Sequence, residues 1–338
     1  MISEPTRSDL KLRMNRLFCP FDRGMKELFF SLVDYRNNLF TSNDIDKIIE
    51  FYNGFENRDQ LIQWMKERPK GVANIHEVEG DKDIIVVIPT ADFNGKYAKE
   101  CRDNIFRGLH VVFVESGGKG DFYFNYAHNC NVGIRKAMEY NPKWIVVSND
   151  DMQKIDNSYK LKNELFKLDS SKIDAVFTYP SQSNYHSYNA QIVQFNVLGI
   201  IVSRIVNVFH NNEASGILMK IRQKFKIDFI FHREIFYEKF LSNKIFKFIH
   251  TGNLAIVSEK FAVMNNGVVY DETFINASED VDLSLRLQSN SMKIVRIDYN
   301  IGDLIGGTFG TNVNRFLREQ IGNTYLSYKI DKKILDVS

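Results

Sequence analysis

The chain has 338 residues, of which 44% are hydrophobic and 25% are charged. These values are typical of a globular protein with a sizeable core, built as one large domain or as one domain with additions. The formal net charge of +2 gives no reason to expect a nucleic acid as the partner of the whole molecule.

The sequence predicts a cytoplasmic protein. The three cysteines are far apart and form no CxxC pair, which fits a reducing compartment and offers no metal cluster. The N-terminus is polar and lacks the apolar core of a secretory signal. The longest apolar stretch, around residues 192–209, is interrupted by polar side chains, so we expect no transmembrane helix.

Residues 1–80 are predicted to form a helical extension packed on the main domain. Apolar residues recur at helical spacing between positions 21 and 40, and the polar residues 42–44 suit the cap of the next helix. A further short helix is expected over residues 59–67, because Pro69 marks a stop. The extension carries no recognisable chemistry, so its role is not predicted.

From residue 81 the pattern changes to alternating strands and helices. Continuous apolar runs, typical of strands buried on both faces, alternate with helical stretches. Such alternation indicates βαβ units with right-handed crossovers. The predicted strands cover residues 84–88, 111–114, 144–148 and 173–178, and the predicted helices cover residues 96–107 and 127–139. We therefore expect an α/β domain over residues 81–338, with a mostly parallel sheet flanked by helices.

Polar residues follow the predicted strand at residues 144–148, which ends on Asn149, Asp150 and Asp151. In an open α/β sheet, ligands bind beyond the carboxyl ends of the parallel strands, where adjacent carboxylates can hold a divalent cation against a diphosphate. Asn and Asp are also the usual residues of a solvated turn after a strand. This stretch alone leaves both interpretations open.

Residues 181–250 interrupt the α/β pattern, and we expect them to form a helical insertion. Between residues 191 and 249, lysines and arginines are interleaved with phenylalanines. Basic amphipathic helices rich in Phe bind the headgroup region of a membrane, which would make the chain a peripheral protein on the cytoplasmic face. The alternative is that the aromatic side chains pack on the core while the lysines face water.

The C-terminal part returns to a sheet-like sequence at residues 251–257. Residues 278–287 are predicted to form a helix that is capped by Ser278, with Glu279 and Asp280 in its first turn, where acids suit the helix dipole. Capping alone would account for these acids equally well. The remaining predicted elements are a glycine-rich loop over residues 302–310 and a helix over residues 314–328.

Several stretches, in this order, resemble the inverting glycosyltransferases of family 2. Residues 84–90 resemble the first strand of that family, whose end touches the nucleotide, and residues 111–118 resemble the second, whose acid, here Glu115, reaches the nucleobase. Asn131-Val132-Gly133 resembles the helix start before the metal motif, and Asn149-Asp150-Asp151 stands where the family has its DxD-type motif.

The stretch Glu279-Asp280-Val281-Asp282-Leu283 completes the resemblance, because it closely matches the ED motif of the family and places Asp280 on the catalytic base. The resemblance covers about residues 83–329, apart from the insertion. It implies the GT-A (Rossmann-like) fold, with a mixed, mostly parallel sheet, and a metal-dependent, inverting transfer of a sugar from a UDP- or GDP-sugar to an acceptor hydroxyl.

The resemblance also assigns roles to residues of this chain. Asp280 would act as general base, with Glu279 orienting it or contacting the acceptor. Asp150 and Asp151 would hold Mn²⁺ or Mg²⁺, for which carboxylate and phosphate oxygens are hard ligands. The residues implied to contact the nucleotide sugar are Pro89, Thr90, Glu115, Asn131, Gly133, Asn149, Asp150, Thr251, Gly252 and Asn253.

The chain departs from the family pattern in two places. Asn149 replaces the first acid of a strict DxD, which leaves open whether Asp150 or Asp151 is the direct metal ligand. Residues 302–310 contain no His, which many members use as a further metal or phosphate ligand. The sugar, the nucleotide and the acceptor, a glycan or a polyprenyl-linked molecule, stay open.

Two other functions are compatible with the same fold. A catalytically inactive sugar-nucleotide-binding or scaffold protein is the main alternative, since a fold does not establish activity. A base at Asp280 favours the enzyme, because a binding module has no need of one. A sugar-nucleotide pyrophosphorylase ranks below both, because such enzymes usually have a glycine-rich phosphate loop after the first strand, where this chain has Pro89-Thr90-Ala91-Asp92.

Overall fold

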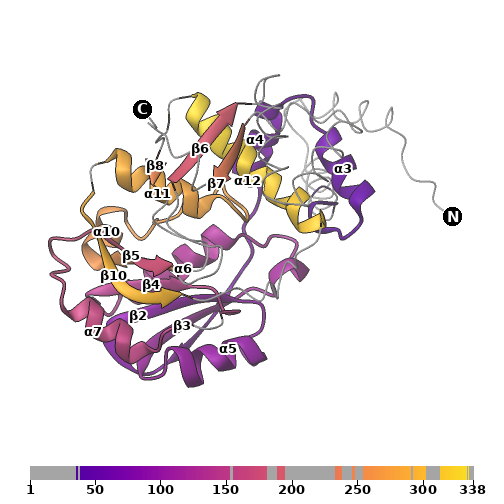
Figure 1. Cartoon of the computed structure of the whole chain (residues 1–338). Helices are drawn as coiled ribbons and strands as arrows, with labels where there is room; N and C mark the ends of the chain where they lie inside the picture. Colours follow the sequence, from indigo (N-terminus) through magenta and orange to yellow (C-terminus); the bar gives the residue numbers. More distant parts are fainter. Residues whose placement is uncertain are drawn as a thin grey trace.

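The structure is a computed structural model. It describes residues 36, 39–152, 155–180, 189–194, 233–237, 246–247, 254–290, 292–301, 313–332 and 334. The described part of the chain has an α/β fold, in which helices cover both faces of a mixed seven-stranded sheet (Figure 1). The predicted fold class is confirmed at this level.

The strands of the main sheet are β1 (Asn74–Val78), β2 (Asp81–Thr90), β3 (Leu109–Glu115), β4 (Trp144–Ser148), β5 (Ala175–Pro180), β9 (Leu254–Ser258) and β10 (Ile294–Ile301). Their order is β1-β3-β2-β4-β9-β5-β10. β2 is parallel to β3 and β4, and β5 is parallel to β10, whereas β9 is antiparallel to β4 and β5, and β1 is antiparallel to β3. Five strands therefore run one way, and β1 and β9 run against them.

Two layers of helices cover the sheet. One face carries α5 (Lys96–Glu100), a π-helical turn (Cys101–Ile105) and α7 (Ser158–Phe166), which lie below the sheet in Figure 1. The helices on the other face are α3 (Ile45–Asn53), α4 (Arg58–Glu67), α6 (Tyr126–Met138), α10 (Glu259–Met264), α11 (Glu279–Ser289) and α12 (Val313–Asp331).

The central strands supply side chains to two separate cores. In β2, Ile85 and Val87 belong to the core on the α6 side, whereas Ile84, Val86 and Ile88 belong to the core on the α5 side. All five side chains are fully buried. A strand covered on both faces requires a continuous apolar run, and this is why β2, β3 and β4 lie where the sequence predicted strands.

The described part of the N-terminal extension shares the core of the α6 side. Asp44 caps α3 by accepting hydrogen bonds from the backbone N–H groups of Asp46 and Lys47, and α4 ends before Pro69, as predicted. The Tyr52 hydroxyl donates to a backbone carbonyl of α12 at 2.5 Å. Strand β1 was not predicted, because a helical segment was expected there. Most of the predicted helix between positions 21 and 40 lies outside the described residues.

The described parts of the expected helical insertion, residues 181–250, are strands. They are β6 (Asn189–Gln194), β7 (Arg233–Tyr237) and β8 (Phe246–Lys247), which form an antiparallel sheet in the order β7-β6-β8. The helical prediction was wrong for these stretches, which hold the β-branched and aromatic residues that favour strands. Most of residues 191–249, considered for membrane contact, lies outside the described residues.

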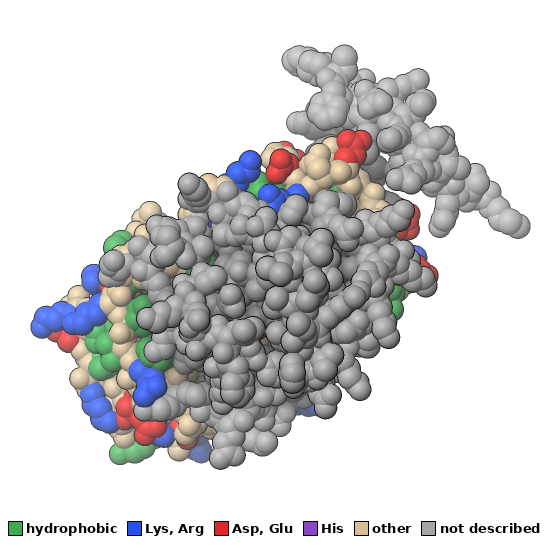
Figure 2. All heavy atoms as spheres, turned by 45° about the horizontal axis from the view of Figure 1, so that its top comes forward, with side chains coloured by type: hydrophobic (Ala, Val, Ile, Leu, Met, Phe, Trp, Pro, Cys, Tyr) green, Lys and Arg blue, Asp and Glu red, His purple; other side chains and the backbone are tan. Residues whose placement is uncertain are grey.

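On the rim of the molecule seen in Figure 2, lysine and arginine side chains lie among aspartate and glutamate side chains. Among the helices that the structure describes, none combines the length and the apolar character needed to cross a bilayer.

Gly133 sets how closely helix α6 lies against the sheet. A Cβ atom at this position would stand 2.2 Å from Val87 Cγ1 and 2.9 Å from Val114 Cγ2. We expect Gly133→Ala to lower the free energy of unfolding by about 1–3 kcal/mol, the usual effect of overpacking a core, as measured by urea denaturation. Gly120→Ala is the control, because a Cβ there would meet no atom within 4 Å. Equal destabilisation by both substitutions would contradict the prediction.

Candidate functional site

The predicted acids lie at one edge of the main sheet, where the parallel strands β2, β3 and β4 end. Thr90 and Glu115 are the last residues of β2 and β3, and Asn149 follows β4. β2 is paired with both other strands, so the three ends are neighbours. The antiparallel β9 begins at the same edge, since Leu254 pairs with Ser148. An edge of this kind forms the crevice in which open α/β sheets bind ligands.

Neighbouring groups hold Asp150 in place, and Asp151 is buried beside it. The hydroxyl of Thr90 donates to Asp150 Oδ2 at 2.7 Å, and the thiol of Cys101 donates to the backbone carbonyl of Asp150 at 3.2 Å. Asp151 is only 7% exposed. Burial raises the pKa of Asp150 to about 6, and the nearby charge of Asp151 adds to the increase. A cation bound here would relieve the repulsion between two close carboxylates.

The two carboxylates fit a hard divalent cation that takes its other ligands from a phosphate. Mg²⁺ is usually bound by one or two carboxylates together with substrate phosphates and water. In the part of the chain that the structure describes, no group of three His, Cys, Asp or Glu side chains is arranged to hold a metal. A cation at Asp150 and Asp151 would need further ligands from a phosphate and from water.

Glu279 and Asp280 begin helix α11 directly after a strained turn. Ala277 and Ser278 have φ angles of 90° and 69°, in the left-handed region that is unfavourable for residues with a side chain. The Ser278 hydroxyl donates to Asn323 Oδ1 of α12 at 2.7 Å. Ser278 thus ties the turn to α12. It also stands at the position predicted for the cap, directly before α11, where its carbonyl accepts from the Asp282 N–H at 2.9 Å.

The two acids of this pair have different surroundings. Asp280 is part-exposed, and its Oδ1 atom accepts a hydrogen bond from the Val281 N–H at 2.8 Å. Glu279 is 5% exposed, and its Oε2 atom is buried without a hydrogen bond from any described residue. Burial, and then the charge of Asp280, raise the pKa of Glu279. The burial of Glu279 does not fit direct contact with an acceptor.

Tyr126, in the first turn of α6, connects the two acidic motifs. Its hydroxyl donates to Asn149 Oδ1 at 2.6 Å. Burial raises its pKa well above the usual value, and nearby titratable groups, among them Glu279, add to the increase. The Tyr126 backbone N–H donates to the carbonyl of Ile275, just before the strained turn, at 2.8 Å. The start of α6 therefore contacts both the segment after β4 and the loop that leads to α11, which are far apart in the sequence.

Asn131 and Gly133 have structural roles. Asn131 is fully buried; its amide donates to the Tyr270 carbonyl at 2.8 Å and to Glu272 Oε1 at 3.1 Å, and its Oδ1 atom accepts from the Tyr270 N–H at 3.0 Å. Gly133 packs against the sheet. We correct the expectation that these residues contact the nucleotide sugar, because both are buried and Asn131 holds the loop before α11.

A buried network of ion pairs fixes helix α11 against its surroundings. Asp282 is fully buried and pairs with Lys329 of α12 at 2.5 Å and with Arg286 at 2.8 Å. Lys329 also lies 2.9 Å from Asp271, in the loop before α11. A buried charge is strongly destabilising without such partners. The network therefore holds the helix whose first turn carries Asp280.

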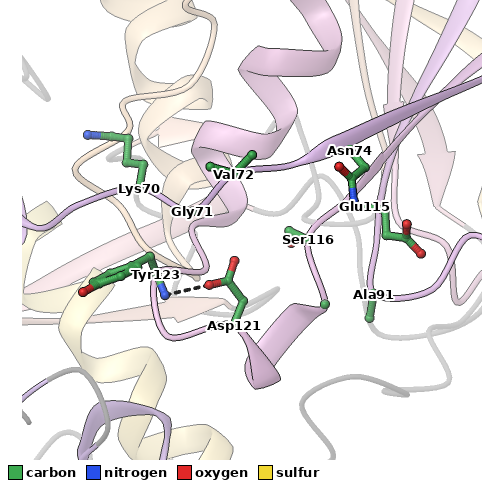
Figure 3. Close-up of a pocket in the computed structure, with 10 residues that line it drawn as sticks. Lys70, Gly71, Val72, Asn74, Ala91, Glu115, Ser116, Asp121 and Tyr123 are labelled. Atoms are coloured by element: carbon green, nitrogen blue, oxygen red, sulfur yellow. Dashed lines mark hydrogen bonds between the residues drawn. The ribbon is translucent and has the colours of Figure 1, made fainter. Parts of the chain in front are cut away.

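Glu115 lines a cavity of about 620 Å³ at the ends of β2 and β3 (Figure 3). Its Oε1 atom accepts from the Phe93 N–H at 2.8 Å, and its Oε2 atom lies 2.9 Å from His76 Nε2. These hydrogen bonds, the backbone one first, lower the pKa of Glu115. The ionised carboxylate can accept hydrogen bonds from a ligand in the cavity.

The other residues predicted to contact the nucleotide sugar differ in their positions. Pro89 is buried within β2, in register with Val114, whereas Thr90 reaches Asp150. The stretch Thr251-Gly252-Asn253 lies outside the described residues.

One wall of the cavity was not predicted from the sequence. Lys70, Gly71, Val72 and Asn74 line it from the segment that leads into β1, where no chemistry was expected. Asp121 and Tyr123 line it from the loop after a 3₁₀ turn (Gly118–Gly120). The available signal was the Pro69 and Gly71 break, which ends the helix and allows a strand to follow.

Ionised Asp150 is expected to lower the stability of the fold. Its pKa of about 6 exceeds the ordinary 3.8, so the folded state binds this proton more tightly than the unfolded state, and stability falls as the pH rises from about 4 to about 6. Above pH 6, the free energy of unfolding of Asp150→Asn should exceed that of the wild type by about 2 kcal/mol, a value that allows for the partial exposure of the side chain. Below pH 4, the two proteins should differ little. Urea unfolding without divalent cations, across this pH range, measures the difference.

The matched control is Asp83→Asn, at the amino end of β2. Asp83 is 46% exposed and pairs with Lys143, and an exposed pair contributes only about 0–1 kcal/mol. A stability difference for Asp150→Asn that does not vary with pH, or that equals the difference for the control, would contradict the assigned burial effect.

Comparison with known proteins does not assign the chain to a family. No protein-family model matches it, and a search of the curated proteins finds no relative.

Proposed function

We propose that the chain is a metal-dependent, inverting glycosyltransferase with the GT-A fold, which moves a sugar from a UDP- or GDP-sugar to an acceptor hydroxyl. The observation that carries this proposal is that Tyr126 is hydrogen bonded both to Asn149, beside Asp150, and to the carbonyl of Ile275, five residues before Asp280. The mixed sheet, with five of seven strands in one direction, is compatible with the fold.

The donor half of the site supports binding of a diphosphate. Asp150 and Asp151 would hold Mg²⁺ or Mn²⁺, which, when bound, offsets the negative charge that builds on the diphosphate as the sugar departs. The hydroxyl of Thr90 orients Asp150 at 2.7 Å. Glu115, in the adjacent cavity, would accept a hydrogen bond from a ring N–H of uracil or guanine.

Asp280 supports the acceptor half of the reaction. The acceptor oxygen attacks the anomeric carbon while the bond from this carbon to the diphosphate oxygen breaks, and the hydroxyl proton passes to the Asp280 carboxylate. The nucleoside diphosphate leaves from the opposite face, so the anomeric centre is inverted. Asp280 is part-exposed and oriented by the Val281 N–H, as a general base requires.

Glu279 is proposed as a positioning residue. It is buried and adjacent to Asp280 in the chain, and burial, then the charge of Asp280, raise its pKa. A proton on Glu279 would remove the repulsion between the two adjacent carboxyl groups and leave the negative charge on the part-exposed Asp280.

The alternative function is a catalytically inactive sugar-nucleotide-binding or scaffold protein of the same fold. Such a protein would use Asp150, Asp151 and the cavity but would have no need of a carboxylate held by the strained turn at Ala277 and Ser278. Strained residues of this kind each cost about 1–3 kcal/mol and cluster at functional sites, which favours the enzyme.

The acceptor remains a proposal at the level of its chemical class, a glycan or a polyprenyl-linked molecule. If the acceptor is polyprenyl-linked, we propose that the protein lies on the cytoplasmic face of the membrane and contacts it through residues 191–249. A polyprenyl phosphate would present an oxygen that is already ionised, so Asp280 would matter less for it than for a hydroxyl.

Asp280→Asn should reduce sugar transfer by about 10²–10⁴-fold, because the general base is removed. Release of UDP or GDP from a panel of nucleotide sugars, with Mn²⁺ and glycan acceptors, measures the rate. The dissociation constant of UDP or GDP with Mn²⁺, measured by calorimetry, should stay within about twofold of the wild type, since Asp280 lies on the acceptor side.

The control is again Asp83→Asn, which removes an exposed carboxylate at the opposite edge of the sheet. Loss of nucleotide binding in Asp280→Asn would mean that Asp280 supports the fold instead of the reaction. Tight nucleotide binding by the wild type, without turnover of any donor in the panel, would favour the scaffold protein.

A further inference from the structure

We propose that the segment from Lys70 to Asn74 forms a wall of the nucleoside pocket, and that the Asn74 amide binds the nucleobase together with Glu115. This inference rests on the proposed function, because it takes the ligand of the cavity to be the nucleoside half of a nucleotide sugar. It gives the N-terminal extension, for which the sequence predicts no chemistry, a direct part in binding the donor.

The cavity borders the carboxylates that would hold the metal. Thr90 stands between them: its hydroxyl donates to Asp150, and its carbonyl accepts from the Ser116 N–H at 3.2 Å. Ser116 and Ala91, the residue after Thr90, both line the cavity. A nucleotide with its diphosphate at Asp150 can therefore place its ribose and base in the cavity, whose volume of about 620 Å³ lies in the range of ligand pockets.

The wall is fixed to the loop across the cavity by hydrogen bonds. Arg68, just before the wall, is 4% exposed, and its guanidinium donates to three consecutive backbone carbonyls of that loop, those of Phe122, Tyr123 and Phe124. The Gly71 N–H donates to the Tyr123 carbonyl at 2.9 Å. The approach is so close that a Cβ on Gly71 would stand 2.3 Å from Asp121 Oδ2. Wall and loop therefore hold one shape around the cavity (Figure 3).

Asn74 and Glu115 are direct partners in the pairing of β1 with β3. Partners in an antiparallel pair place their Cβ atoms about 4.5–5.5 Å apart on the same face of the sheet. Both side chains line the cavity, and Asn74 is exposed (Figure 3). The carboxylate only accepts hydrogen bonds, whereas the amide also donates. Together they match a base edge with an N–H group next to a carbonyl oxygen, as in uracil and guanine.

The test compares three probes, each with Mn²⁺, by calorimetry: UDP, GDP and inorganic pyrophosphate. Asn74→Ala should weaken binding of the preferred nucleotide by about five- to tenfold, the effect of one lost hydrogen bond. Pyrophosphate binding should not change, because this probe needs only Asp150 and Asp151. Asn74→Asp should weaken nucleotide binding further, since it places a second negative charge beside Glu115.

The matched control is Ile75→Thr, which changes the next residue of β1, on the opposite face of the strand and outside the cavity lining; its nucleotide affinity should equal that of the wild type.

Unchanged nucleotide affinity in both Asn74 variants, with loss of affinity in Asp150→Asn, would overturn this inference and leave the proposed function standing. Equal weakening of nucleotide and pyrophosphate by Asn74→Ala would overturn it too, because the residue would then act on the fold. A wild-type protein that binds neither nucleotide nor pyrophosphate would overturn the proposed function, and this inference with it.

Discussion

The hydrogen bonds between helix α6 and the loop before α11 are the contacts on which the candidate site depends. Asn131 bonds both to the N–H and to the carbonyl of Tyr270, and the close packing of Gly133 fixes the same helix to the strands of the sheet. The loop leads into the turn that carries Asp280. The position of Asp280 is therefore fixed, through α6, relative to the sheet whose strand β4 leads into Asp150, although the two acids belong to distant parts of the sequence.

The central strands and the acids at their ends could be predicted, because burial on both faces leaves an unbroken apolar run, as in β2 and β4, and because parallel strands gather their carboxyl ends at one edge. β1 could not be predicted, because it is a short edge strand of five residues with mixed polarity. A segment of this length is too short for its pattern of apolar residues to distinguish a strand from a helix. The role of Asn131 could not be predicted either, because its partner Tyr270 is 139 positions away and a polar residue in a helix looks the same in sequence whether it holds a loop or a ligand.

Three buried or part-buried acids near the site show how structural and functional carboxylates differ. Asp282 has no exposed surface, and Lys329 and Arg286 compensate its charge, so it stabilises the packing of α11. Burial raises the pKa of both Asp150 and Glu279. Groups kept in such unfavourable surroundings are common where a cation or a proton has to be bound, and a protein retains them at some expense of stability.

The turn at Ala277 and Ser278 has a consequence for any search for more stable variants. Glycine adopts positive φ angles without steric strain, so a glycine at either position would relieve the backbone. It would also increase the freedom of the segment that aims Asp280, and at position 278 it would remove the hydroxyl that is bonded to Asn323. Random mutagenesis under selection for heat resistance would therefore enrich glycine substitutions at positions 277 and 278. The selected variants would be more stable but would hold Asp280 less firmly in position.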